Sequence, residues 1–145
     1  MSLTRLVYYS LRNPSMNVDI PKLIETANRN NRSKNVTGIL HHNQNAFLQV
    51  LEGHRAEVNV IYHIIAADPR HMNLTIIECA DVKERLFPYW SMALHESMED
   101  RSSCKFLRYF GNIFVNPESV SSADLAKVLH DLSVDMKQSV PVEVN

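Results

Sequence analysis

The run AFLQVLE, residues 46–52, places apolar side chains on both faces of any strand that it forms. Because successive side chains of a strand point to opposite faces, Phe47, Gln49 and Leu51 share one face, and three further apolar residues share the other. A strand that is apolar on both faces belongs inside a sheet that is covered on both sides. Within this apolar row the amide of Gln49 needs a hydrogen-bonding partner inside the protein.

Strand and helix patterns follow one another in a defined order up to residue 96. Apolar and alternating runs predict strands, i, i+3, i+4, i+7 spacing predicts helices, and Asn, Pro and Gly mark the turns. The expected elements are strands at 4–10, 36–42, 46–52, 74–80 and 90–95, and helices that start near Pro21 and after Gly53. This order is β-α-β-β-α-β followed by one more strand. It predicts an α+β, ferredoxin-like sheet with both helices on one face.

The chain changes in character beyond Glu96. The expected elements there are two helices and a frayed tail, at 101–109, 122–137 and 139–145. We therefore expect one domain at 1–96 and a C-terminal helical extension at 97–145. Because the central strand is apolar on both faces, we expect the C-terminal helices, or a second subunit, to cover the face that the first two helices leave open.

Composition argues against several classes of function. Only three glycines occur, which excludes a Walker loop and the dinucleotide-binding fingerprint. A net charge of −1 gives no general attraction to nucleic acid or to anionic membranes, and no apolar run approaches the length that spans a bilayer. The seven histidines include no pair with the spacing of a closed zinc site, so no metal site is predicted. With no charged-then-apolar leader at the N-terminus, we expect a cytoplasmic protein.

Three polar side chains are predicted to meet in one layer of the core. Extending the apolar stripe of the first helix brings Asn31 to the same side as Gln49, and Tyr8 lies on the neighbouring central strand. Taken singly, Asn31 could end the helix, Gln49 could bond a nearby carbonyl, and Tyr8 could be an ordinary core residue. A buried polar group without a partner costs about 1–3 kcal/mol. Together the three residues favour a polar ligand held between the helices and the sheet.

Two further groups have both a structural and a functional interpretation. Trp90 and Met92 share one face of the last predicted strand. Packing at the edge of the sheet and a functional role both agree with this position. Arg70 and His71 follow the end of the second helix in a short predicted loop. There they could complement the helix dipole or bind an anion.

The motifs that carry these residues occur in the order RLVYYS, NRNN and NVTGIL, FLQVLEG, DPRH and WSM, spread over residues 5–92. In residues and in spacing the set resembles the BLUF family of blue-light sensors that use FAD. The short C-terminal part resembles the short, stand-alone, PixD-like members of that family. The resemblance implies a ferredoxin-like domain whose two helices hold the flavin.

The resemblance also implies a role for each motif residue. Tyr8 matches the tyrosine that donates an electron to the excited flavin, and Gln49 matches the switch glutamine between that tyrosine and the flavin edge. Asn31 matches the asparagine at the flavin carbonyls, and Asn30 matches a neighbouring, variable position. The other matched residues are the fifth-strand pair Trp90 and Met92, the ring-sandwiching Leu23, Ile24 and Ile65, and, near the phosphate end, Arg70 and His71.

The function implied is reversible blue-light sensing by a noncovalent flavin, with FAD expected and FMN or riboflavin as alternatives. The implied protein is not an enzyme. It forms a homo-oligomer, a dimer or larger, and signals to a separate downstream protein or through altered subunit assembly. The main alternative is a light-independent, small-ligand-binding regulatory module of the same fold, which a colourless purified protein would favour. An RNA-binding domain and an acylphosphatase-like hydrolase fit less well, because no basic face and no glycine-rich phosphate loop occur.

Overall fold

The computed structural model describes residues 2–42, 46–88, 93–96, 130 and 134, with the side chains of 93–96 left aside. The chain divides into two compact units, Met1–Glu96 and Ser97–Asn145. In the second unit the described residues His130 and Val134 are helical and exposed, within the helix predicted at 122–137. The rest of that unit, including the other predicted helix and the predicted tail, lies outside the described residues.

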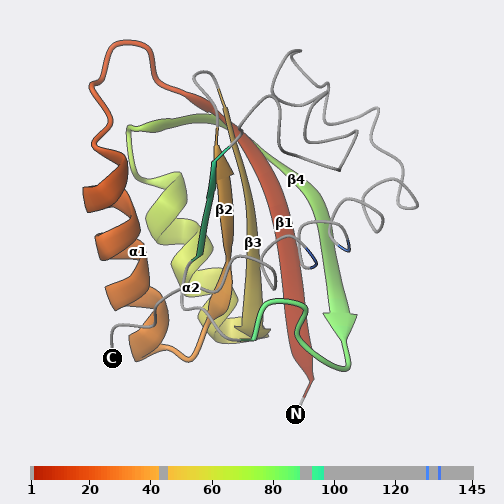
Figure 1. Cartoon of the computed structure of the whole chain (residues 1–145). Helices are drawn as coiled ribbons and strands as arrows, with labels where there is room; N and C mark the ends of the chain where they lie inside the picture. The colour runs from red at the N-terminus through yellow and green to blue at the C-terminus, as the bar shows by residue number, and fades with distance from the viewer. Residues whose placement is uncertain (1, 43–45, 89–92, 97–129, 131–133, 135–145) are drawn as a thin grey trace. The chain divides into compact units, whose positions relative to one another are not determined.

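The first unit contains one five-stranded sheet and two helices. In chain order its elements are β1 (Leu3–Arg12), α1 (Ile20–Ser33), β2 (Thr37–His42), β3 (Ala46–His54), α2 (Arg55–Ala66), β4 (His71–Val82) and β5 (Ala93–Glu96). The strand order is β4-β1-β3-β2-β5, with β5 parallel to β2 and the other pairs antiparallel. Both helices lie on one face of the sheet (Figure 1). The predicted α+β, ferredoxin-like order with a fifth strand is confirmed.

Local sequence explains where α1 begins and ends. The Asp19 carboxylate accepts a hydrogen bond from the backbone N–H of Lys22 at 3.2 Å, and Pro21 stands in the first turn, where its missing N–H costs nothing. The helix continues through Asn31 to Ser33, and Asn35 takes the left-handed conformation after it, with φ of 53°. Asn31 is therefore inside the last turn, and the interpretation of Asn31 as the residue that ends the helix is wrong.

The close pairing of β2 and β3 explains one glycine. A Cβ atom at Gly38 would lie 1.9 Å from the backbone oxygen of Val50, so no other residue fits there without moving a strand. This close approach keeps β2 in register with β3, where Leu40 is opposite Gln49. The glycine of the NVTGIL motif thus has a packing reason of its own.

The strand β4 is longer than its sequence pattern predicts. It begins at His71 and ends at Val82, whereas the apolar run predicts a strand at 74–80. Pairing with β1, in which His71 is opposite Arg12, extends it. The prediction that His71 lies in a loop is therefore wrong, and Arg70 is the last residue before the strand.

Both faces of the central strands are buried, as the pattern of β3 predicts. On the helix side, Leu6, Tyr8, Phe47 and Leu51 form a core cluster with residues of both helices. On the opposite side the apolar residues at most 1% exposed are Val7, Ile39, Leu48 and Val50. The predicted cover for this second face falls on residues outside those that the structure describes. Among the described residues no helix is long and apolar enough to cross a membrane.

Candidate functional site

The centre of the site is a hydrogen bond between two adjacent strands. Tyr8 on β1 is directly opposite Gln49 on β3, and the Tyr8 hydroxyl donates to the Gln49 side-chain oxygen Oε1. Both residues are buried, with exposures of 0% and 3%. The amide therefore satisfies one of its polar atoms within the sheet layer and turns toward the helices, as the apolar row around it predicts.

The surroundings of Tyr8 keep its phenol neutral. Burial, and after it the nearby Tyr62 and Asp68, raise the pKa of Tyr8 well above its ordinary value of 10.0. The ring of Tyr62 lies edge-on to it, with centroids 5.5 Å apart. At neutral pH Tyr8 is thus a hydrogen-bond donor in an apolar environment, and its hydroxyl proton is directed at Gln49.

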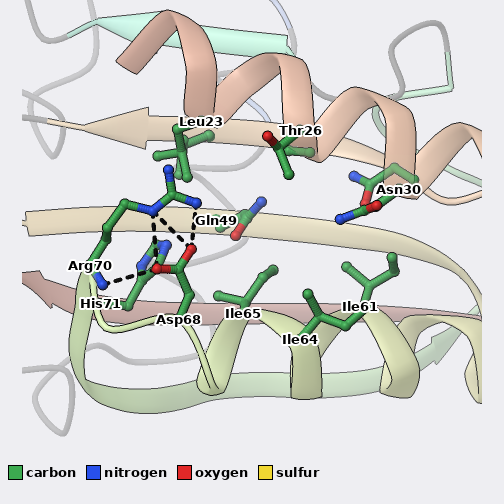
Figure 2. Close-up of a pocket in the computed structure, with 13 residues that line it drawn as sticks. Leu23, Thr26, Asn30, Gln49, Ile61, Ile64, Ile65, Asp68, Arg70 and His71 are labelled. Carbon is green, nitrogen blue, oxygen red and sulfur yellow. Dashed lines mark hydrogen bonds and ion pairs between the residues drawn. The ribbon is translucent and has the colours of Figure 1, made fainter. Parts of the chain in front are cut away.

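A pocket lies between α1 and α2, with Gln49 at its sheet side (Figure 2). The enclosed cavity is about 50 Å³, and the empty space around it, including the mouth that is open to solvent, is about 490 Å³. The exposed surface of its wall is mainly apolar, and its amides come from α1 and β3. The lining residues are Leu23, Thr26, Ala27, Asn30 and Asn31 of α1, Leu40 and Gln49 of the sheet, Ile61, Ile64 and Ile65 of α2, and Asp68, Arg70 and His71 after it.

At one end of the pocket Arg70 and Asp68 form a two-pronged ion pair. The guanidinium nitrogens Nε and Nη2 of Arg70 lie 2.9 Å and 2.6 Å from the Asp68 oxygen Oδ2, and both side chains are about one quarter exposed. Although burial alone would raise it, hydrogen bonds from Arg70 lower the pKa of Asp68. The charge of Arg70 is therefore largely balanced within the protein, which weakens the interpretation of Arg70 as a free anion-binding group.

His71 lines the pocket, and its ring is largely held within the core. Its Nδ1 lies 2.9 Å from the hydroxyl oxygen of Ser10, and its ring centroid lies 4.6 Å from that of Phe47. Burial is the main cause that lowers the pKa of His71 from 6.5 to about 4, so the ring is neutral at physiological pH. A neutral imidazole held by Ser10 offers no charge to a phosphate group.

The predicted site residues fall into three groups. The pocket lining includes the predicted residues Leu23, Asn30, Asn31, Gln49, Ile65, Arg70 and His71. Tyr8 is linked to the pocket through Gln49, and Ile24 packs at the edge of the core cluster without lining the pocket. Trp90 and Met92 lie outside the described residues.

The sequence interpretation missed several residues of the wall. Ile61 and Ile64 of α2 were detectable, because Ile61 stands four positions before Ile65 and three before Ile64 on the helix. Ile64 is 46% exposed and lines the pocket, so a ligand bound there could cover it. Asp68 also belongs to the site, and its position two residues before Arg70 was the available signal. Ala27 stands on the predicted apolar stripe of the first helix, four positions before Asn31, whereas Thr26 and Leu40 complete the wall without any distinct sequence signal.

The chemistry of these side chains fits a flat ring that is apolar on its faces and polar at one edge. Leucine and isoleucine from two helices can cover the faces, while the amides of Asn30, Asn31 and Gln49 can meet the polar edge with both donors and acceptors. An isoalloxazine ring has this character. No group of three or more metal-ligating side chains occurs within the part of the chain that the structure describes.

The sequence profile of the family described as BLUF, sensors of blue light using FAD, matches residues 3–93, which is more than half of the chain. The chain belongs to the BLUF family. The match spans all of the sheet except the last residues of β5, and it includes every residue that lines the pocket.

Curated relatives share this BLUF region within longer proteins. The chain is 38% identical over 95 residues to the blue light- and temperature-regulated antirepressor BluF of Escherichia coli (strain K12), covering 65% of this chain and 24% of that protein. It is 36% identical over 88 residues to the photoactivated adenylate cyclase subunit beta of Euglena gracilis, covering 60% of this chain and 10% of that protein. The chain thus spans at most about a quarter of the length of these relatives.

Solved BLUF structures match over most of the chain. The photo-activated state of BlsA superposes with a TM-score of 0.79 at 28% identity, covering 91% of this chain and 95% of that one. The dark state of BlrB, a BLUF protein, superposes with a TM-score of 0.78 at 26% identity, covering 92% and 97%. These likenesses agree with the ferredoxin-like fold described above.

Proposed function

We propose that this protein is a reversible blue-light sensor that holds a noncovalent flavin between α1 and α2. The observation that carries the proposal is the hydrogen bond from the buried Tyr8 to Gln49, at the sheet side of a pocket with aliphatic walls and an amide edge. Membership of the BLUF family supports it. FAD is the flavin expected, with FMN and riboflavin as alternatives, and the protein acts as a sensor rather than as an enzyme.

Asn31, Asn30 and Gln49 would meet the polar edge of the ring, and Leu23, Ile61 and Ile65 would cover its faces. When bound, the flavin supplies light absorption and an electron acceptor; the protein tunes this chemistry. Tyr8 would give one electron and its hydroxyl proton to the excited flavin, and both would return to Tyr8 after Gln49 has changed its hydrogen bonds. An amide suits this role because its oxygen accepts and its nitrogen donates, so that a rotated or tautomerised Gln49 presents a different partner to the same ring edge.

The altered Gln49 would bias the segment that holds Trp90 and Met92, and through it the C-terminal part of the chain, subunit contacts or a separate signalling protein. This is a population shift, in which light changes the balance between two arrangements of the protein. We expect the protein to work as a homo-oligomer in the cytoplasm.

The absorption spectrum of the purified protein before and after blue light tests the proposal. We expect a flavin spectrum that shifts to longer wavelength on illumination and returns in the dark. Tyr8→Phe and Gln49→Leu should both bind flavin, because neither change alters the aliphatic walls, and both should lose the reversible shift.

A matched control is Tyr9→Phe, which removes a hydroxyl from the neighbouring residue of β1 on the opposite face of the sheet. It should keep the shift. A Tyr8→Phe protein that shifts like the unaltered one would contradict the electron-donor role. A colourless protein that binds no added flavin would favour the light-independent ligand-binding module.

A further inference from the structure

Glu52 is a buried carboxylate that the proposed photochemistry does not use. Its side chain is 0% exposed, near the end of β3, and by strand alternation it points to the face opposite Gln49. The Arg5 nitrogen Nε lies 2.9 Å from its oxygen Oε2. A buried charge is tolerated when it is paired and its remaining acceptor sites receive hydrogen bonds. The other groups that donate hydrogen bonds to this carboxylate therefore identify the part of the chain that Glu52 keeps in place.

Those donors are backbone N–H groups of the connection between β4 and β5. The N–H of Leu86 donates to Oε2 at 3.0 Å, and the N–H of Phe87 donates to Oε1 at 2.8 Å. The Phe87 side chain is 0% exposed. Both carboxylate oxygens of Glu52 thus fix the path of the chain at these two consecutive residues.

Arg85, in the same connection, makes a second set of ties. Its Nη1 donates to the Thr37 hydroxyl at 2.8 Å and to the Glu52 backbone oxygen at 3.0 Å. Its Nη2 donates to the backbone oxygen of Asn35 at 2.9 Å, in the turn that joins α1 to β2. The connection is therefore bound to β2, to β3 and to the turn that follows the helix carrying Asn30 and Asn31.

These contacts lie just before the part of the chain that contains Trp90 and Met92. They end at Phe87, and β5, which runs parallel to β2, begins at Ala93. The residues between, 88–92, include Trp90 and Met92. The tie at Phe87 thus fixes the chain on the N-terminal side of Trp90 and Met92.

We propose that Glu52 is a positioning residue of the light switch, which pins residues 85–87 to the sheet and confines the light-driven change to the chain that follows Phe87. This inference rests on the proposed blue-light function. Without the pin, part of the change would be lost in movement of residues 85–87, and the response of the segment around Trp90 would be weaker.

Amide hydrogen exchange on the full chain with bound flavin, in the dark and under blue light, tests the inference. In the unaltered protein the Leu86 and Phe87 amides should exchange slowly and equally in both states. In Glu52→Gln both N–H groups lose a charged acceptor, and one of them faces the amide NH2, which cannot accept a hydrogen bond. Exchange of that N–H should be about 5- to 150-fold faster, which is the range for loss of one buried hydrogen bond. Arg85→Gln is the second variant, to be used if Glu52→Gln does not fold, because it leaves the buried Arg5–Glu52 pair intact. It should increase the exchange of the same two amides by a smaller factor.

Trp90 is the single tryptophan of the chain, so its fluorescence reports on the segment that follows Phe87, where the light-driven change is proposed. Glu52→Gln and Arg85→Gln should keep the flavin spectral shift, yet show a reduced light-minus-dark change in Trp90 emission. Glu57→Gln is the matched control, because Glu57 is 38% exposed on α2 and pairs only with Lys34 among the described ion pairs.

The inference would be overturned if the Leu86 and Phe87 amides exchanged at equal rates in the unaltered and Glu52→Gln proteins. It would also be overturned if these two amides exchanged faster in the unaltered protein under blue light than in the dark. An unchanged Trp90 response in both variants would also overturn it. Absence of any flavin shift in the unaltered protein would instead overturn the proposed function, and the exchange in the dark would still decide whether Glu52 pins the connection.

Discussion

His71 shows how burial decides the chemistry of a single residue. Its neighbour Arg70 made an anion site a reasonable prediction, yet the ring lies in the core, against Phe47 and within hydrogen-bonding distance of Ser10. Burial holds the pKa of His71 at about 4, against 6.5 for an exposed histidine. The side chain is thus kept neutral, and its contribution is to packing near Tyr8, whose ring centroid is 6.4 Å away.

This pKa predicts how stability depends on pH. Between about pH 6.5 and about pH 4 the unfolded chain binds a proton at His71 that the folded chain does not, so the free energy of unfolding falls as the pH is lowered through this window. The loss from pH 7 to pH 5 should be about 2 kcal/mol from this residue. Urea unfolding of the unaltered protein and of His71→Gln at both pH values measures it. The variant should lose less stability on acidification, and equal losses would contradict the assignment.

The strands β2 and β3 show how an element can depend on one close approach. Gly38 lies where a Cβ atom would overlap the Val50 carbonyl, and β2 in turn pairs with β5 on its other edge. Gly53 is less tightly placed, because a Cβ atom there would lie 3.2 Å from the Val36 side chain and 3.3 Å from the Asn35 oxygen. Neither glycine has a positive φ angle, so close packing alone distinguishes them.

We therefore expect Gly38→Ala to separate β2 from β3 and Gly53→Ala to be tolerated with small shifts. The first substitution should cost about 3 kcal/mol or more, and the second about 1 kcal/mol, as expected for overpacking of different severity. Chemical denaturation of both variants measures these costs. Equal costs would show that the strands adjust to Gly38→Ala more easily than the geometry indicates.

For the whole molecule, the central question is what covers the second face of the sheet. The apolar side chains Val7, Ile39, Leu48 and Val50 are buried there, and both helices of the first unit lie on the other face. We expect residues 97–145, or a second copy of the chain, to provide the cover. Either cover would let a structural change in the sheet reach the C-terminal part of the chain or the contacts between subunits.

Truncation after Glu96 should then expose this face. The shortened protein should aggregate, form larger assemblies or unfold at a lower denaturant concentration, because about 25 cal/mol of stabilisation is lost for each Å² of apolar surface returned to water. Removal of 139–145 alone, the predicted frayed tail, is the control and should change little. Light scattering and denaturation measure both effects. A soluble truncated monomer of unchanged stability would show that the C-terminal unit does not cover the face.

The sequence by itself determined the order of the elements, the two apolar faces of β3 and the place of Gln49 on one of these faces. These follow from period-two and helical spacing, which are local properties of the chain. Only the tertiary structure decided that β4 starts at His71, that Asp68 balances Arg70, and that Glu52 holds Leu86 and Phe87. Each of these depends on partners that meet through pairing between strands or through the path of a loop, which local periodicity does not record. Strand alternation placed the Gln49 amide in the core, and the position of its partner on β1 made it part of a site.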